Sequence, residues 1–222
     1  MANYLNSFRP LCGTRFGRDR LAENATLHPF VDASCRREPD LQHCYPAITA
    51  ICRASRFAPR LRREDRVIYL TIKDRYAGHD ERCWGLIAAL RVVEVAPTHA
   101  EGAAWYRGRG LEPGNNCFVP ETTPLPLTAT SGLPAHYDSV RAWDFAYRRR
   151  VQRWPCFVIT EPIAVDLDTP AVVTSETLMC IFGRLPVTRN PPRITDAEFG
   201  ALLEVGRMAP DGRLARPAGR RV

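Results

Sequence analysis

The segment HPFVDASCRREPDLQ, residues 28–42, concentrates polar groups that could act on a ligand. Arginine offers a planar fork that matches phosphate or a base edge, and serine and carboxylate groups complement exocyclic amines and carbonyls. Small and polar residues dominate the segment, so we expect an exposed loop rather than a core strand. Such a loop either contacts a ligand or only makes internal salt bridges, which are common on protein surfaces. Its candidate binding residues are Ser34, Arg36, Arg37, Glu38 and Asp40.

A second group combines Thr71, Lys73 and Glu94. A hydroxyl, an amine and a carboxylate near one another can hydrolyse an amide, with the lysine as base. Thr71 and Lys73 are two residues apart on a predicted strand, which puts their side chains on one face. Glu94 belongs to the strand expected to pair with it, and the register that would bring it into reach is left open by the sequence.

Aromatic side chains accompany the predicted strands. An exposed ring beside arginine can stack on a base, which is worth about 1–3 kcal/mol per base. The alternative is that Tyr69 and Trp84 are core residues. The rings concerned are those of Phe8, Phe30, Tyr69, Tyr76 and Trp84.

Cysteine and histidine gather in the first quarter of the chain, at Cys12, His28, Cys35, His43, Cys44 and Cys52. This composition could ligate zinc, but the spacings match no compact zinc module and there is no C-x-x-C pair. The phosphate-binding glycine loops, the G-x-S-x-G elbow and the H-E-x-x-H motif are also missing from the sequence. The sequence therefore predicts neither a metal nor another cofactor.

Short runs rich in Val, Ile, Leu, Tyr or Thr predict the elements that must position these groups. We expect strands near residues 4–8, 47–52, 66–72, 85–95 and 156–165. Capping-box patterns at Thr98 and Thr195 predict the starts of two helices. Apolar spacing predicts a third helix over residues 135–154, and a short helix is expected over residues 175–183. Strands mixed with helices indicate an α+β fold.

The net charge of the chain is +7. Net positive charge favours polyanionic partners such as nucleic acid. The stretch RMAPDGRLARPAGRRV, residues 207–222, is expected to be a basic flexible tail. It holds five arginines and one aspartate, so without it the net charge falls to about +3. The body of the protein is thus mildly basic.

No apolar run approaches the roughly 20 residues that a membrane span needs. The first residues, MANYLNSFRPLCG, lack the pattern of a signal peptide. We therefore expect a cytoplasmic protein without a membrane partner.

The stretch PAITAICRASRFAPRLRREDRVIYLTIK, followed by GLIAALRVVEVAPTHAEGAAWY, resembles the PUA-like superfamily, which includes the EVE, ASCH and YTH domains. The turn Arg63-Glu64-Asp65-Arg66 matches the turn before the apolar strand of those domains, with Glu64 where a glycine is usual. The chain looks most like prokaryotic nucleotide-modification-associated domains, in which a polar Cys/Arg-containing stretch precedes an F-A-P motif. The resemblance covers about residues 28–106.

The resemblance implies a small β-barrel of five to six strands with flanking and C-terminal helices. Residues 1–206 would form one domain, with residues from about 111 as a helical elaboration. Such domains typically bind a modified or flipped nucleotide in a barrel-side pocket. We therefore expect nucleic-acid binding, with DNA, RNA or a free nucleotide as partner. The expected pocket combines the five loop residues with Tyr69, Lys73 and Trp84. The ASCH branch includes amidohydrolases and nucleases, so a nucleobase- or nucleoside-acting hydrolase that uses Thr71, Lys73 and Glu94 is the alternative.

Overall fold

Among the residues that the structure describes, seven strands form one mixed sheet in the order β2–β5–β4–β3–β1–β7, and β6 pairs with β4. The computed structural model describes residues 1–76 and 79–207. Strands β1 and β3 run parallel, and the other pairs are antiparallel. The strands are β1 (Asn3–Phe8), β2 (Ala47–Thr49), β3 (Arg66–Thr71), β4 (Trp84–Ala96), β5 (Phe157–Val165), β6 (Ala171–Val173) and β7 (Arg193–Ile194).

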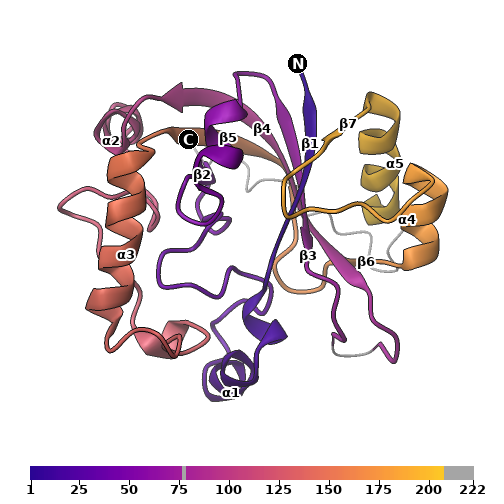
Figure 1. The fold of residues 1–222 in the computed structure, drawn as a ribbon, viewed down its shortest axis with the longest axis horizontal. Helices are drawn as coiled ribbons and strands as arrows, with labels where there is room; N and C mark the ends of the chain where they lie inside the picture. The colour runs from indigo at the N-terminus through magenta and orange to yellow at the C-terminus, as the bar shows by residue number, and fades with distance from the viewer. Residues whose placement is uncertain (77–78, 208–222) are drawn as a thin grey trace.

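One face of the sheet is covered by two helices, α4 (Ser175–Phe182) and α5 (Asp196–Arg207). Figure 1 shows both helices on the same side of β1, β3 and β4. Their side chains pack with strand residues that alternate toward this face, as the two-residue period of a strand requires. The cluster includes Leu5, Ile68, Leu70, Leu178, Phe199 and Leu202.

The opposite face is covered by irregular chain and by helices that contribute less to its core. Residues 31–41, which we call the polar strap, are buried along their whole length. Behind the strap lies α3 (Val140–Arg153), and α1 (Arg15–Glu23) lies at one end of this layer (Figure 1). The 3₁₀ turns of this chain are η1 (Leu11–Gly13), η2 (Ala54–Arg56), η3 (Ala58–Arg60) and η4 (Leu127–Ala129).

Helix α2 (His99–Arg107) packs against the start of β5. A Cβ atom on Gly102 would lie 2.4 Å from the ring of Phe157, so only glycine permits this close approach. The helix begins where the capping box predicts, because the Thr98 hydroxyl accepts a hydrogen bond from the Glu101 amide. The Thr195 capping box is also confirmed at the start of α5.

The five predicted strands and four predicted helices are all present, with shifted ends. The helix expected from residue 135 begins only at Val140, because Ser139 is its N-cap. Helix α1 and strands β6 and β7 were not predicted from the sequence. The first residue of the predicted tail, Arg207, is the last residue of α5, and residues 208–222 lie outside the described residues.

The α+β expectation is confirmed, but the closed barrel is not found, because the sheet is open. Among residues 1–76 and 79–207, no strand pairing joins the edges β2 and β7. The outer edge of β2 meets the polar strap instead, through one isolated bridge between Asp40 and Ala47. The chain after residue 111 is more than a helical elaboration, since β5 lies between β2 and β4.

In the part of the chain that the structure describes, every helix is too short or too polar to cross a membrane.

Candidate functional site

The polar strap is not the exposed loop that its composition suggests. Residues 31–41 lie between the sheet and α3, and their polar groups find partners inside the protein. Burying a polar group is costly unless it is hydrogen-bonded, so these partners determine the conformation of the strap.

Arg36 is fully buried and every part of its guanidinium group is engaged. Its Nε donates to Asp144 Oδ1 at 2.6 Å, and Nη1 donates to the Asn115 carbonyl at 2.8 Å. Nη1 and Nη2 also contact Thr122, and the group stacks 4.4 Å from the centre of the Phe118 ring. Arg36 therefore joins α3 to the segment before it, and its expected role as a ligand contact is not supported by this geometry.

Arg37 is also turned inward. It donates to the carbonyl oxygens of Asp32 and Ala129, the latter at 2.7 Å. Its Nε is buried without a partner among the described residues. Burial lowers the pKa of Arg37, while the neighbouring Asp32 and Asp40 oppose this shift. Ser34, which is also buried, donates its hydroxyl to Asp32 Oδ1.

Glu38 and Asp40 accept hydrogen bonds from neighbouring chain. Glu38 accepts from the Thr49 amide at 2.9 Å and from the Thr49 hydroxyl at 2.6 Å. Burial nevertheless raises the pKa of Glu38 to about 8, so the carboxyl group keeps its proton over much of the neutral range. Asp40 accepts from the Asn115 amide at 2.7 Å, and burial raises its pKa as well.

Tyr69 lies opposite Asn6 in the β1–β3 register, on the face of the sheet that meets the strap. Its hydroxyl is buried and has no hydrogen-bond partner among the described residues. Burial and then the Glu38 charge raise its pKa, while Asn6 and Arg53 lower it. The Asn6 side chain is near enough to act on the hydroxyl without the geometry of a full hydrogen bond.

Cys52 lies beside Tyr69 and is exposed to solvent. Burial nevertheless raises the pKa of its thiol well above the usual value. Asp32 and Glu38 also raise this pKa, whereas Arg150 and Arg53 lower it. We use the name Cys52 recess for the group Cys52, Arg53, Tyr69, Glu38 and Asp32, whose charges act on one another.

Lys73 and Trp84 lie elsewhere. Lys73 Nζ donates to Ser175 Oγ at 2.7 Å, at the start of α4, and lies 4.8 Å from the centre of the Trp84 ring. Trp84 packs against the core under α4 and α5, on the face of the sheet opposite to Tyr69. The predicted pocket residues are thus divided between the two faces of the sheet.

The structure also separates Thr71 from Glu94. The Thr71 hydroxyl accepts from the Gly85 amide at 2.8 Å. Glu94 lies nine residues further along β4, which is about 30 Å at roughly 3.3 Å per residue. It faces Arg63 at 3.8 Å instead. A hydrolytic group of Thr71, Lys73 and Glu94 is therefore not assembled.

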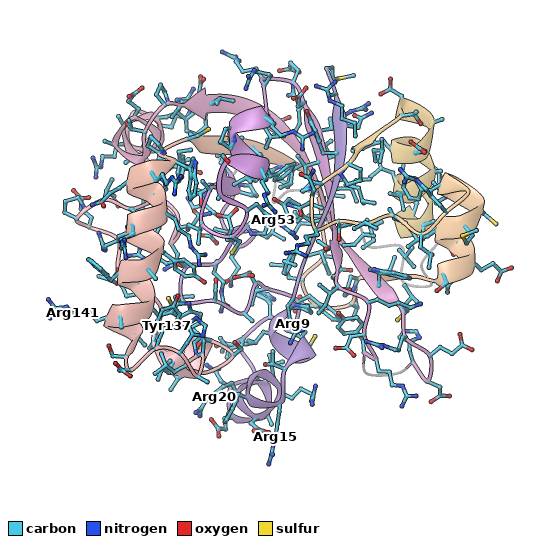
Figure 2. All side chains as sticks on the ribbon, viewed as in Figure 1. Arg9, Arg15, Arg20, Arg53, Tyr137 and Arg141 are labelled. Atoms are coloured by element: carbon cyan, nitrogen blue, oxygen red, sulfur yellow. The ribbon has the colours of Figure 1, made fainter. Side chains whose placement is uncertain are left out.

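A group of cations on the strap side of the molecule was missed by the sequence analysis. Figure 2 shows Arg53 near the middle of the view, Arg9 below it, and further cations along α1 and at the start of α3. Within the described parts of the chain, Arg9, Arg15, Arg53 and Arg141 pair with no carboxylate. We call the set Arg9, Arg15, Arg53 and Arg141 the arginine rim. The available signal was the basic stretch that follows β1, FRPLCGTRFGRDR.

Arg53 and Arg150 connect the rim to the recess. Arg53 donates to the carbonyls of Ser7 at 2.6 Å and Arg189 at 2.9 Å, so its position is fixed without neutralising its charge. Arg150 donates to the Ile51 carbonyl at 2.7 Å, beside Cys52. Two positively charged side chains are thus held beside Cys52 by uncharged backbone carbonyls.

Among residues 1–76 and 79–207, no three His, Cys, Asp or Glu side chains are grouped to hold a metal ion. Comparison of the chain with family models, curated proteins and solved structures finds no match.

Proposed function

We propose that the protein binds nucleic acid by admitting one nucleotide into the Cys52 recess while the arginine rim contacts phosphates. The observation that carries this proposal is a set of four arginines without carboxylate partners among the described residues, on the same side of the sheet as the buried polar groups around Tyr69. Phosphate groups neutralise such cations and release counterions, which gives affinity without sequence preference.

Base recognition would come from the interior. The Tyr69 hydroxyl is buried without a partner, so a ligand that offers one would remove an existing penalty. The Glu38 carboxyl group and the Arg53 guanidinium group add polar groups near the same place. Extruding a base costs a few kcal/mol, and contacts of this kind recover that cost.

The resemblance to PUA-like domains that read modified bases favours a modified base. The pocket proposed here differs from a barrel-side pocket, because it lies between an open sheet and the polar strap. It uses Tyr69 from the original expectation, with Glu38 as a wall residue, and replaces Arg36 and Arg37 by the arginine rim.

The test is fluorescence anisotropy with labelled oligonucleotides that carry unmodified or modified bases, at two salt concentrations. The double variant Arg9→Ala, Arg15→Ala should bind at least about tenfold more weakly, and its salt slope on a single strand should fall by about 0.7 per lost phosphate contact. The matched control is Arg82→Ala, Arg184→Ala, which removes two exposed arginines outside the rim. Equal losses in both double variants would reduce the binding to general charge and overturn the proposal.

A further inference from the structure

A further candidate site is a hollow along α3. Its volume is about 670 Å³, and it extends from Pro124 across the first two turns of the helix to Arg148. We call it the α3 groove. Neither the sequence analysis nor the proposed recess involves it.

The groove is positively charged despite containing a carboxylate. Among the described residues that line it, Asp144 alone is acidic, and both carboxylate oxygens are engaged: Oδ1 with Arg36 at 2.6 Å and Oδ2 with Arg148 at 2.8 Å. Arg141, which also lines the groove, makes no ion pair with any described residue. The net positive charge of the groove therefore comes from the exposed Arg141.

The groove also presents an aromatic ring to solvent. Phe145 is 61% exposed and lines the groove together with Arg141 and Arg148. Positions 141, 145 and 148 are spaced by four and three residues, so they form one row along the helix. An exposed ring between cationic side chains is the arrangement on which single-stranded nucleic acid stacks its bases.

Helix α3 links this groove to the recess. Arg141 belongs to both the arginine rim and the groove (Figure 2). At the other end, Arg150 follows Arg148 by two residues and reaches the Ile51 carbonyl beside Cys52. Helix α3 thus supplies cations both to the groove and to the neighbourhood of Cys52.

We propose that the α3 groove binds a further nucleotide of the same strand, with its base stacked on Phe145. The ligand class is then single-stranded nucleic acid of several nucleotides rather than a free nucleotide, because a base in a duplex offers no face for stacking. This inference rests on the proposed function of the recess. Charge complementarity and the exposed ring favour this occupant over an apolar partner.

The test compares fluorescein-labelled single strands of 12 and 3 nucleotides with the same central sequence, as DNA and as RNA. The wild type should bind the 12-mer at least about tenfold more tightly than the 3-mer. Phe145→Leu, which keeps an apolar side chain without a ring face, should weaken 12-mer binding about fivefold or more and leave 3-mer binding unchanged. Phe145→Tyr keeps the ring and should bind both strands as the wild type does.

Two results separate this inference from the proposed function. Phe145→Leu with wild-type affinity for the 12-mer would remove the groove from the strand path, and 3-mer binding would still support the recess. If the wild type bound neither the 3-mer nor the 12-mer, both proposals would be overturned. If polyglutamate displaced the labelled 12-mer as well as an unlabelled strand does, the proposal for the groove would also be overturned. Binding would then depend on charge and not on base stacking.

Discussion

The face of the sheet under α4 and α5 is packed mainly with apolar side chains, whereas the opposite face is covered by a strap that buries five acidic or basic ones. Under the helices, Leu5, Ile68 and Leu202 interlock in an ordinary core. Under the strap, the buried groups are Asp32, Arg36, Arg37, Glu38 and Asp40. The first arrangement stabilises the fold by removing apolar surface from water.

The second arrangement is costly, because charged groups lose their hydration when they are buried. Proteins depart from simple packing rules at functional sites in particular. The recess and the rim both lie on the strap side of the sheet. We therefore assign stability mainly to the helix-covered face and ligand binding to the strap-covered face.

The largest expected effect concerns the ion pair between Arg36 and Asp144. Arg36→Ala leaves a buried carboxylate without its partner, so the free energy of unfolding should fall by about 3–5 kcal/mol. Chemical denaturation measures this change. Arg148→Ala removes the partly exposed partner of the same carboxylate and should cost about 1 kcal/mol or less. Equal small losses in both variants would show that Arg36 is not a structural anchor.

The helix-covered face is tested by Leu202→Ala, which creates a cavity in an apolar core. We expect a loss of about 3 kcal/mol in the free energy of unfolding. Oligonucleotide binding per folded molecule, measured by anisotropy below the unfolding transition, should not change. A variant that folds fully but binds more weakly would show that the two faces do not divide stability and binding as proposed.

The local parts of this comparison could be predicted from the sequence. Strand periodicity and the capping boxes at Thr98 and Thr195 depend on neighbouring residues, and both predictions are confirmed. The burial of the strap could not be predicted, because its partners are remote: Asp144 lies 108 residues from Arg36. The same charged residues can face water or pair with a distant buried group, and the local sequence is identical in both cases.

The candidate site follows the same rule. Tyr69 was predicted from its strand, but the sequence could not tell which face of the sheet it shares with other candidates. The arginine rim is assembled from the end of β1, from α1, from the chain after β2 and from α3. Each contribution is unremarkable in its own segment, so only the fold reveals the group.

A pH titration of stability sharpens the comparison at Glu38. Its pKa is raised by burial from 4.5 to about 8 in the folded protein. Between these values the unfolded chain has lost a proton that the folded protein keeps, so the free energy of unfolding falls as pH rises. The slope for this one proton approaches about 1.4 kcal/mol per pH unit and disappears above about pH 8.

Glu38→Gln removes this titrating proton and keeps the shape of the side chain. It should reduce the slope of the free energy of unfolding against pH, between about pH 4.5 and 8, by the contribution of one proton. Denaturant titrations at several pH values measure the slope. Glu176→Gln, an exposed carboxylate at the start of α4, is the matched control and should keep the wild-type slope. A Glu38→Gln slope equal to that of the wild type would place the ionised form of Glu38 in the folded protein.

The smallest expected change in stability comes from Tyr69→Phe, which removes a buried hydroxyl without a partner. Leaving such a group unsatisfied is unfavourable, so the variant should be as stable as the wild type or up to about 1 kcal/mol more stable. If the hydroxyl contacts a base, binding should nevertheless weaken about tenfold. The control is Tyr106→Phe, whose hydroxyl donates to the Tyr45 carbonyl at 2.7 Å; its loss should cost about 1 kcal/mol and leave binding unchanged. Opposite signs for stability and binding at Tyr69 are expected of a group held ready for a ligand. A hydroxyl that mattered only for packing would change neither affinity nor base preference, and that result would exclude Tyr69 from the recess contacts.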